Sequence, residues 1–159
     1  MRQVAAFCAL SWSDRRLLIE AFATLVLVRV ALHAWTIERL RRWAGRLERG
    51  AKPVDRIVWA VRTASRWTPG TTCLGSALAL QRLLSAEGYV SELHIGIARQ
   101  QPGLVAHAWV VHEGRILIGE DEQATYTQLT NWRAGDFSAS ELSAREISDD
   151  PRARGLPQG

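Results

Sequence analysis

Cysteine is scarce in this sequence: Cys8 and Cys73 are the only thiols among 159 residues. A small secreted scaffold held by disulfides needs several bridges, so the sequence excludes that class of protein. A reducing compartment fits better, and we predict a cytoplasmic protein. In such a compartment Cys73 is free for chemistry, whereas Cys8, in a short apolar run, is expected to have a structural role.

Long hydrophobic runs are also missing. The longest apolar stretch, residues 21–35, is about 15 residues long, whereas a transmembrane helix needs about 20. Arg29 and His33 interrupt this stretch. The N-terminal apolar run covers only about eight residues, and no cleavage site of the secretory type follows it. The sequence therefore predicts neither a signal peptide nor a transmembrane helix.

Neither sign of charge is in large excess: 20 Lys and Arg residues stand against 16 Asp and Glu residues. No basic run with interleaved aromatic residues is present, so nucleic-acid binding is not predicted. The arginines gather in one region, at Arg39, Arg41, Arg42, Arg46 and Arg49. This pattern is typical of the solvated face of a helix, although it permits an anionic partner. Association with a membrane surface through a helix over residues 14–43 is a weaker alternative that stays open. It would need a clean apolar face flanked by cations, and the arginines over residues 39–49 crowd one end of this helix.

The first half of the chain has the apolar spacing of α-helices. The predicted helices span residues 13–49, 55–67 and 71–87. Ser13 or Asp14 can cap the first helix. Residues 68–70, Thr-Pro-Gly, break the chain sharply before the last helix, and Gly88 ends that helix.

After Gly88 the hydrophobic period changes to two, which indicates strands. The predicted strands span residues 93–98, 104–112, 115–120 and 126–132. Helices followed by an antiparallel meander predict an α+β fold with the helices on one side of the sheet. We expect one domain over residues 1–137, helical over 13–87 and with its sheet over 90–132. The polar tail, residues 138–159, is expected to be flexible.

Cys73 opens the third predicted helix, directly after the Pro-Gly break. The free N–H groups and the dipole at a helix start favour a thiolate, which is the nucleophilic form of cysteine. The helical stripe of Cys73, Ala77, Leu80 and Leu84 should pack on the sheet, so the sulfur should point towards the strands. The same stripe would also accommodate a buried, inert cysteine, and this alternative stays open.

His107 lies in an apolar strand, where an ionisable group needs a partner. The neighbouring hairpin can supply one. A two-residue loop at residues 113–114 pairs Trp109 with Ile118, and the same count places Glu120 opposite His107. A carboxylate there would fix the imidazole tautomer and leave the other ring nitrogen for the cysteine. A bulge in the hairpin would bring Asp121 to the site instead.

The sequence therefore offers a nucleophile, a base and an acid in the order Cys73, His107 and Glu120. A zinc site built from Cys73, His94 and His107 is a weaker interpretation, because no paired ligand spacing supports it. We predict no metal and no cofactor.

Several segments together resemble a known family. They are PGTTCLGSALALQRLLSAEG, HIGIA and AHAWVVHEGRILIGE, together with the upstream DRRLLIEA and IVWAVRTASRWTPG and the later Tyr126-Thr127. They resemble the B protein of lasso-peptide biosynthesis, a leader peptidase whose catalytic part is a transglutaminase-like cysteine protease domain. The resemblance covers roughly residues 10–132. It implies a papain/transglutaminase-like cysteine peptidase fold.

The resemblance also implies a function. A member of this family removes the N-terminal leader from a ribosomally made precursor peptide and frees the amino group of the core for a separate ATP-dependent cyclase. Cys73 would be the nucleophile and His107 the base. The third member of the family's triad is usually an aspartate on the next strand, where this chain has Glu120 and Asp121. No leader-recognition module fits before the helices, so we expect a separate leader-recognition protein as a partner.

A different class of function remains open. The chain could be a catalytically inactive transglutaminase-like scaffold, or a peptide-binding module in a maturation complex. The reactivity of Cys73 towards a thiol reagent, compared with that of Cys8, would separate this interpretation from an enzyme.

Overall fold

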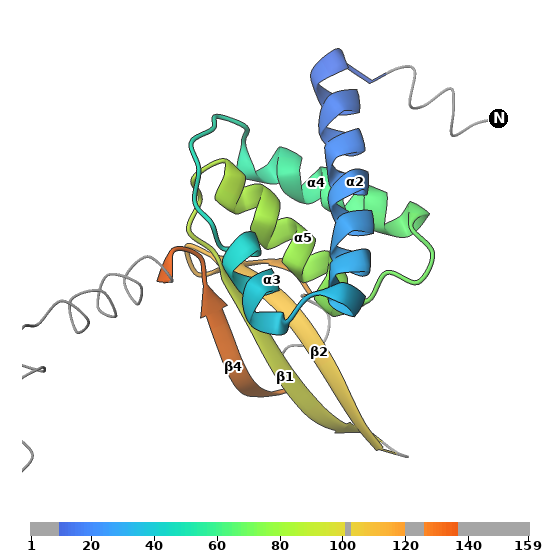
Figure 1. Ribbon diagram of the computed structural model, residues 1–159, viewed down its shortest axis with the longest axis vertical. Coiled ribbons are helices and arrows are strands. Elements are labelled where there is room, and N and C mark those ends of the chain that lie inside the picture. The colour runs from blue at the N-terminus through green and yellow to red at the C-terminus, as the bar shows by residue number, and fades with distance from the viewer. Residues whose placement is uncertain (1–9, 101–102, 120–125, 137–159) are drawn as a thin grey trace, which may run out of the picture.

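Helices come first in the chain and strands second, as Figure 1 shows. The structure is a computed structural model that describes residues 10–100, 103–119 and 126–136. The helices are α2 (Trp12–Ala34), α3 (Ile37–Ala44), α4 (Val54–Trp67) and α5 (Cys73–Ala86). The strands are β1 (Glu92–Gln100), β2 (Gly103–His112), β3 (Arg115–Ile118) and β4 (Thr127–Arg133). The N-terminal nine residues and the predicted tail lie outside the described part of the chain.

The single helix predicted over residues 13–49 is wrong, because the structure has two helices there. Trp35 is extended and ends α2, and Thr36 caps α3 with its side chain accepting from the backbone N–H of Arg39. A threonine cap offers the backbone an alternative to helix continuation, and the apolar period does not reveal it. The cap of α2 is Ser11, whose side chain accepts from the N–H of Asp14, rather than Ser13 or Asp14.

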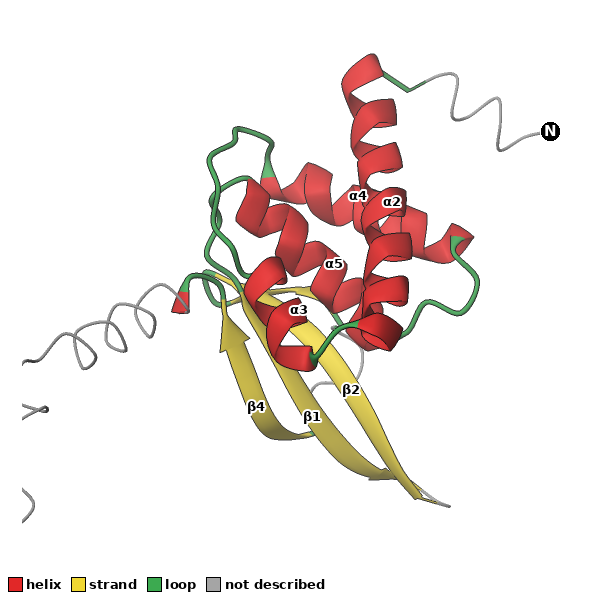
Figure 2. Cartoon of the chain, in the orientation of Figure 1, coloured by secondary structure: helices red, strands yellow, loops and turns green. Residues whose placement is uncertain are grey.

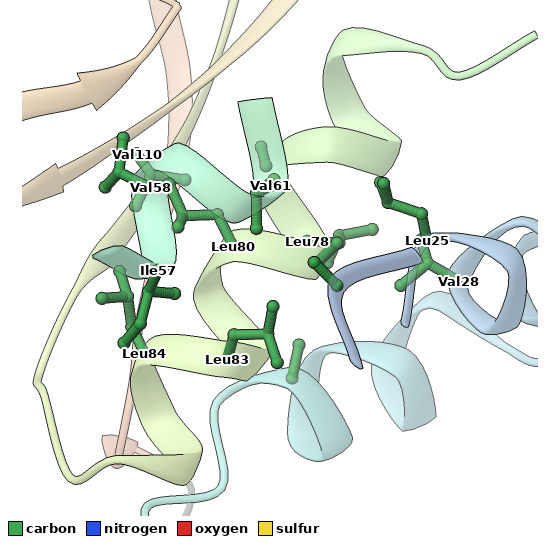
Figure 3. Close-up of a cluster of buried hydrophobic side chains, with 14 of the residues drawn as sticks. Leu25, Val28, Ile57, Val58, Val61, Leu78, Leu80, Leu83, Leu84 and Val110 are labelled. Carbon is green, nitrogen blue, oxygen red and sulfur yellow. The ribbon is translucent and has the colours of Figure 1, made fainter. Parts of the chain in front are cut away.

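Helix α5 is the centre of the fold. Its Ala77, Leu80 and Leu84 are fully buried, and it packs against β1 and β2 on one side and α2, α3 and α4 on others. Side chains from α2, α4, α5 and β2 meet in one apolar cluster, part of which Figure 3 shows. The helices lie on one side of the sheet, as predicted (Figure 2).

The sheet is antiparallel with the strand order β3-β2-β1-β4. Strand β4 pairs with β1 rather than with β3, so the predicted meander is wrong for its last strand. The reason lies in the packing beneath the sheet. Trp132 of β4 stands beside Leu93 over the core, and the side-chain amide of Gln81 on α5 donates to the carbonyl oxygen of Trp132 at 2.8 Å.

The hairpin between β2 and β3 turns at Glu113 and Gly114, as predicted, and both residues have positive φ, at 50° and 75°. Such a two-residue turn matches the twist of its strands. The predicted register holds next to the turn but shifts between Val110 and Val111, so that Val110 pairs with Ile118. The predicted pairing of Trp109 with Ile118 is therefore wrong.

Leu117 is the extra residue at this bulge. Its side chain is buried in the core, and its carbonyl oxygen accepts a hydrogen bond from Arg62 of α4. The bulge thus buries an apolar side chain and satisfies its backbone oxygen, which explains why β3 does not keep the simple register.

Helix α2 has 23 residues and is long and apolar enough to cross a membrane, by length and composition only. The apolar stretch over residues 21–35, which was compared with the length of a transmembrane helix, covers only part of this helix, because the helix begins at Trp12. A core helix of a water-soluble domain passes the same test.

Candidate active site

A tight turn leads into the helix that carries Cys73. Thr71 donates its N–H to the carbonyl oxygen of Thr68 at 3.2 Å, and Gly70, the third residue of this turn, has a φ of 73°. A turn with proline second and a residue of positive φ third is of type II, and glycine adopts that φ without strain. The predicted break therefore becomes a defined turn that aims the chain into α5.

Helix α2 holds this turn from outside. Arg29 donates a hydrogen bond from Nη1 to the carbonyl oxygen of Pro69. A Cβ on Gly70 would lie 2.6 Å from the same nitrogen, so a larger residue there would displace the guanidinium. The position of the turn before Cys73 therefore depends on a side chain 40 residues earlier.

Thr72 caps the start of α5. Its Oγ1 accepts from the N–H of Gly75 at 3.1 Å, and its carbonyl oxygen accepts from the N–H of Ser76 at 3.0 Å. The N–H groups of Cys73 and Leu74 have no acceptor within the helix, as at every helix start. Two backbone donors and the positive end of the helix dipole therefore lie beside the thiol, where they can stabilise negative charge.

Cys73 itself is exposed. The rest of its predicted stripe, Ala77, Leu80 and Leu84, is fully buried. The stripe therefore enters the core one turn after the cysteine. The alternative of a buried cysteine is therefore wrong, and a reagent or substrate can reach this sulfur.

The sulfur approaches β2 next to His107. Cys73 Sγ lies 3.9 Å from the carbonyl oxygen of Ala106, to which the thiol donates a long, weak hydrogen bond. A carbonyl oxygen and the following Cα share one planar peptide unit, so Sγ is at most roughly 7 Å from the Cα of His107. The structure thus brings the predicted nucleophile to the backbone of the predicted base.

The imidazole of His107 points to the outer face of the sheet. Ala108 and Val110 of the same strand pack in the core below, and side chains alternate along a strand. Trp109 shares the outer face with His107, and their rings stack with centroids 6.3 Å apart. Strand β3 pairs with β2 only from Val110 to His112, so it does not flank Ala106, where the sulfur lies. The predicted contact between the thiol and the imidazole is therefore wrong for this structure: the sulfur lies beside the backbone of Ala106, whereas the imidazole points to the outer face of the sheet.

One nitrogen of the imidazole faces the end of β3. His107 Nε2 is buried without a hydrogen-bond partner, and a Cβ on Gly119 would lie 3.0 Å from it. Gly119 has a φ of 86° and also approaches Trp109 and Ala108 closely. The chain enters Glu120 and Asp121 directly after this glycine. Both carboxylates lie outside the described residues, so the structure does not test the choice between them.

Sequence reasoning missed the aromatic support around His107. Trp109 is almost fully buried, and His94 stacks on it with ring centroids 5.5 Å apart, while Tyr126 lies 5.1 Å from the His107 ring. A Cβ on Gly96 would come within 3.0 Å of the Trp109 ring, so glycine makes space for the indole. The alternation of His107 and Trp109 along one strand was the signal that both share a face.

His94 shares the outer face and stacks on Trp109. Its side chain is 13% exposed, and Nε2 lies 3.3 Å from a carboxylate oxygen of Glu92. Within residues 10–100, 103–119 and 126–136, no group of three or more His, Cys, Asp or Glu side chains could hold a metal ion.

Comparisons with known proteins agree with the fold. The family model described as the transglutaminase-like superfamily matches residues 17–131, which include Cys73 and His107. Neither a curated protein nor a solved structure matches the chain.

Proposed function

This chain belongs to the transglutaminase-like superfamily, and we propose that it is a cysteine peptidase which removes the leader from a ribosomally made lasso precursor peptide. The superfamily includes enzymes of the cysteine-protease type, which supports the reaction class. The observation that carries the proposal is the exposed Cys73 at a capped helix start, 3.9 Å from the backbone oxygen next to His107. The resemblance to the lasso B proteins supports the substrate class.

In the proposed reaction the Cys73 thiolate attacks the scissile carbonyl carbon and forms a thioester after the C–N bond breaks. The backbone N–H groups of Cys73 and Leu74 stabilise the oxyanion. This step requires the imidazole of His107 to turn round the edge of β2 towards Cys73 Sγ. There it takes the proton of the thiol and then gives it to the leaving amine. Water then hydrolyses the thioester and releases the leader acid, with His107 acting as the base.

The identity of the third triad residue depends on the pairing register that follows Ile118. The count that placed Glu120 opposite His107 assumed an unbroken ladder, whereas Val110 pairs with Ile118, one residue further along. If the pairing continued along β2 with this offset of one residue, Asp121 would lie opposite His107. The aspartate that this family usually carries supports the same choice, so we favour Asp121.

The remaining parts of the proposal rest on the resemblance. A separate leader-recognition protein would hold the precursor, and an ATP-dependent cyclase would use the freed amino group. A cytoplasmic location agrees with the need for a reduced thiol.

Mass spectrometry of a candidate precursor incubated with the full chain tests the proposal, with and without the leader-recognition protein. We expect one cleavage at the leader–core junction and complete loss of it in Cys73→Ala. Cys8→Ser is the matched control, because it removes the other thiol and should cleave normally. Normal cleavage by Cys73→Ala would refute the proposal.

A catalytically inactive scaffold is the second candidate. The observation that favours it is the orientation of His107, whose ring stacks on aromatic side chains of the outer face. Alkylation separates the two functions. In an enzyme iodoacetamide should label Cys73 much faster than a free cysteine peptide at neutral pH, and His107→Ala should remove this excess reactivity. In an inactive scaffold Cys73 of the parent and of His107→Ala should both be labelled at the rate of the free cysteine peptide.

A further inference from the structure

Helix α2 exposes an apolar stripe on its outer face. Its inner face, which includes Leu17, Ala21, Leu25 and Val28, is buried against α4 and α5. The exposed stripe consists of Ile19, Phe22, Val26, Leu27 and Val30, with Trp12 at the beginning of the helix. Their exposed fractions range from 40% for Val26 to 79% for Trp12. Ile19, Phe22, Val26 and Val30 are three or four positions apart, and Leu27 adjoins Val26, so they form one continuous surface on the helix.

This surface differs from scattered exposed apolar residues, which every protein has. A continuous exposed apolar surface commonly marks an interaction site for another protein or for a membrane. Helix α2 packs on the other helices rather than on the sheet, so its outer face lies away from the strand that carries His107 (Figure 1). A partner on this face therefore leaves β2 uncovered.

The charges of α2 and α3 that are left without an ion-pair partner among the described residues are positive. Arg16 of α2 and Arg42 of α3 are exposed and have no ion-pair partner within the described ranges. Arg39, also exposed, places its guanidinium over the ring of Trp35. The acidic residues of the same helices are paired: Asp14 with Arg56, Glu20 with Lys52, and Glu38 with Arg41.

We propose that the outer face of α2 docks the protein on a membrane surface that contains anionic lipids. An apolar stripe accompanied by unpaired arginines is complementary to an interface of acyl chains and negative headgroups. A second copy of this chain would instead bring the same arginines together. The helix lies on the membrane rather than across it, because Leu17, Ala21 and Val28 on its inner face are part of the core.

Flotation of the full chain with vesicles tests the proposal. Vesicles of phosphatidylcholine alone are compared with vesicles of phosphatidylcholine and phosphatidylglycerol. We expect the protein to float with the anionic vesicles and to be released as salt screens the headgroups. Ile19→Ser/Val30→Ser should weaken binding at least about tenfold, since apolar area leaves the interface. Arg16→Gln/Arg42→Gln should weaken binding to the anionic vesicles by about fivefold for each cation.

Leu129→Ser is the matched control, because Leu129 on β4 is as exposed as Ile19, at 60%. It should bind like the parent, and all variants should keep the parent's circular dichroism and melting temperature. Equal flotation of the Ile19→Ser/Val30→Ser variant would overturn the proposal. So would absence of binding to both vesicles, or a dimer in light scattering that the same variant converts to a monomer. Leader cleavage is measured in a separate assay. Failure of vesicle binding therefore leaves the proposed peptidase function untouched, and failure of cleavage leaves the membrane proposal untouched.

Discussion

Arg62 on α4 donates a hydrogen bond from Nη2 to the carbonyl oxygen of Leu117 at 2.8 Å. This bond connects the helical layer to the bulge of β3, three residues before Glu120. The bulge is the reason for proposing Asp121 rather than Glu120 as the acid partner of His107. A contact beneath the sheet thus bears on that proposal.

The first prediction concerns that choice. Asp121→Asn should lower kcat/KM for leader cleavage by about 100-fold or more, because the amide cannot stabilise the imidazolium. Glu120→Gln should change it only a few-fold. Steady-state kinetics of the two isosteric variants measures the difference. The reverse ranking would show that the ladder returns to the simple hairpin count beyond Ile118.

A second prediction tests the bulge itself. Arg62→Met keeps the length of the side chain but removes the donor, leaving the carbonyl oxygen of Leu117 without this partner. We expect a loss of about 1–3 kcal/mol in the free energy of unfolding, with a fall in cleavage at saturating substrate. Arg66→Met, on the same helix, is the control and should affect neither. Unchanged unfolding of Arg62→Met would show that burial of Leu117 alone fixes the bulge.

Local signals predicted most of the fold. Helices α4 and α5 and all four strands lie within two residues of their predicted bounds. Their signals, the hydrophobic period and the turn residues, depend only on residues that are close together in the sequence. The position of Cys73 at a helix start was predicted for the same reason, but its exposure was not. The bulge at Leu117 and the pairing of β4 with β1 were missed, because both depend on side chains of distant helices, Arg62 and Gln81.

The surroundings of His107 were missed for a related reason. The strand pattern shows that Trp109 shares a face with His107, but it does not show what covers that face. Gly96 and Gly119 were assigned to a strand and to its end. Their real importance is the space that they leave, for the indole in one case and the imidazole in the other.

The third prediction concerns Gly96. In Gly96→Ala the new Cβ would meet the Trp109 ring and the backbone of Thr127, each at 3.0 Å. We expect a destabilisation of about 1–3 kcal/mol and a loss of cleavage activity greater than the loss of folded protein, because Trp109 supports His107. Urea unfolding and kinetics on the folded fraction measure the two effects. Gly114→Asn is the control, since asparagine tolerates the positive φ of this turn and nothing lies near its Cβ.

The fourth prediction concerns pH. Lys52 Nζ lies 2.5 Å from Glu87 and 3.2 Å from Glu20. Burial raises the pKa of Glu87, but the hydrogen bonds and charge of Lys52 outweigh it, so the pKa lies below the ordinary 4.5. The folded state therefore holds the proton more weakly than the unfolded chain. The stabilisation is complete above pH 4.5 and is lost as the pH falls through the folded-state pKa.

Glu87→Gln should accordingly melt at a lower temperature than the parent near neutral pH, and the difference should shrink as the pH falls below about 4.5. Glu38→Gln is the control, because Glu38 forms an exposed ion pair with Arg41 at 3.4 Å. Melting curves collected from about pH 3 to pH 7 test this. A constant difference between Glu87→Gln and the parent over that range would mean that the ion pair does not carry the acid sensitivity.

The last prediction separates the structural role of a helix cap from its chemical role. Thr72 caps α5 beside Cys73, and Thr36 caps α3 away from it, each through its side-chain oxygen. Thr72→Ala and Thr36→Ala should both destabilise the fold by about 1 kcal/mol. Only Thr72→Ala should also slow alkylation of Cys73, because fraying of the first turn of α5 moves the N–H groups that stabilise the thiolate. Thr72→Ser should restore both properties. Equal alkylation rates in the two alanine variants would mean that the helix start does not activate the thiol.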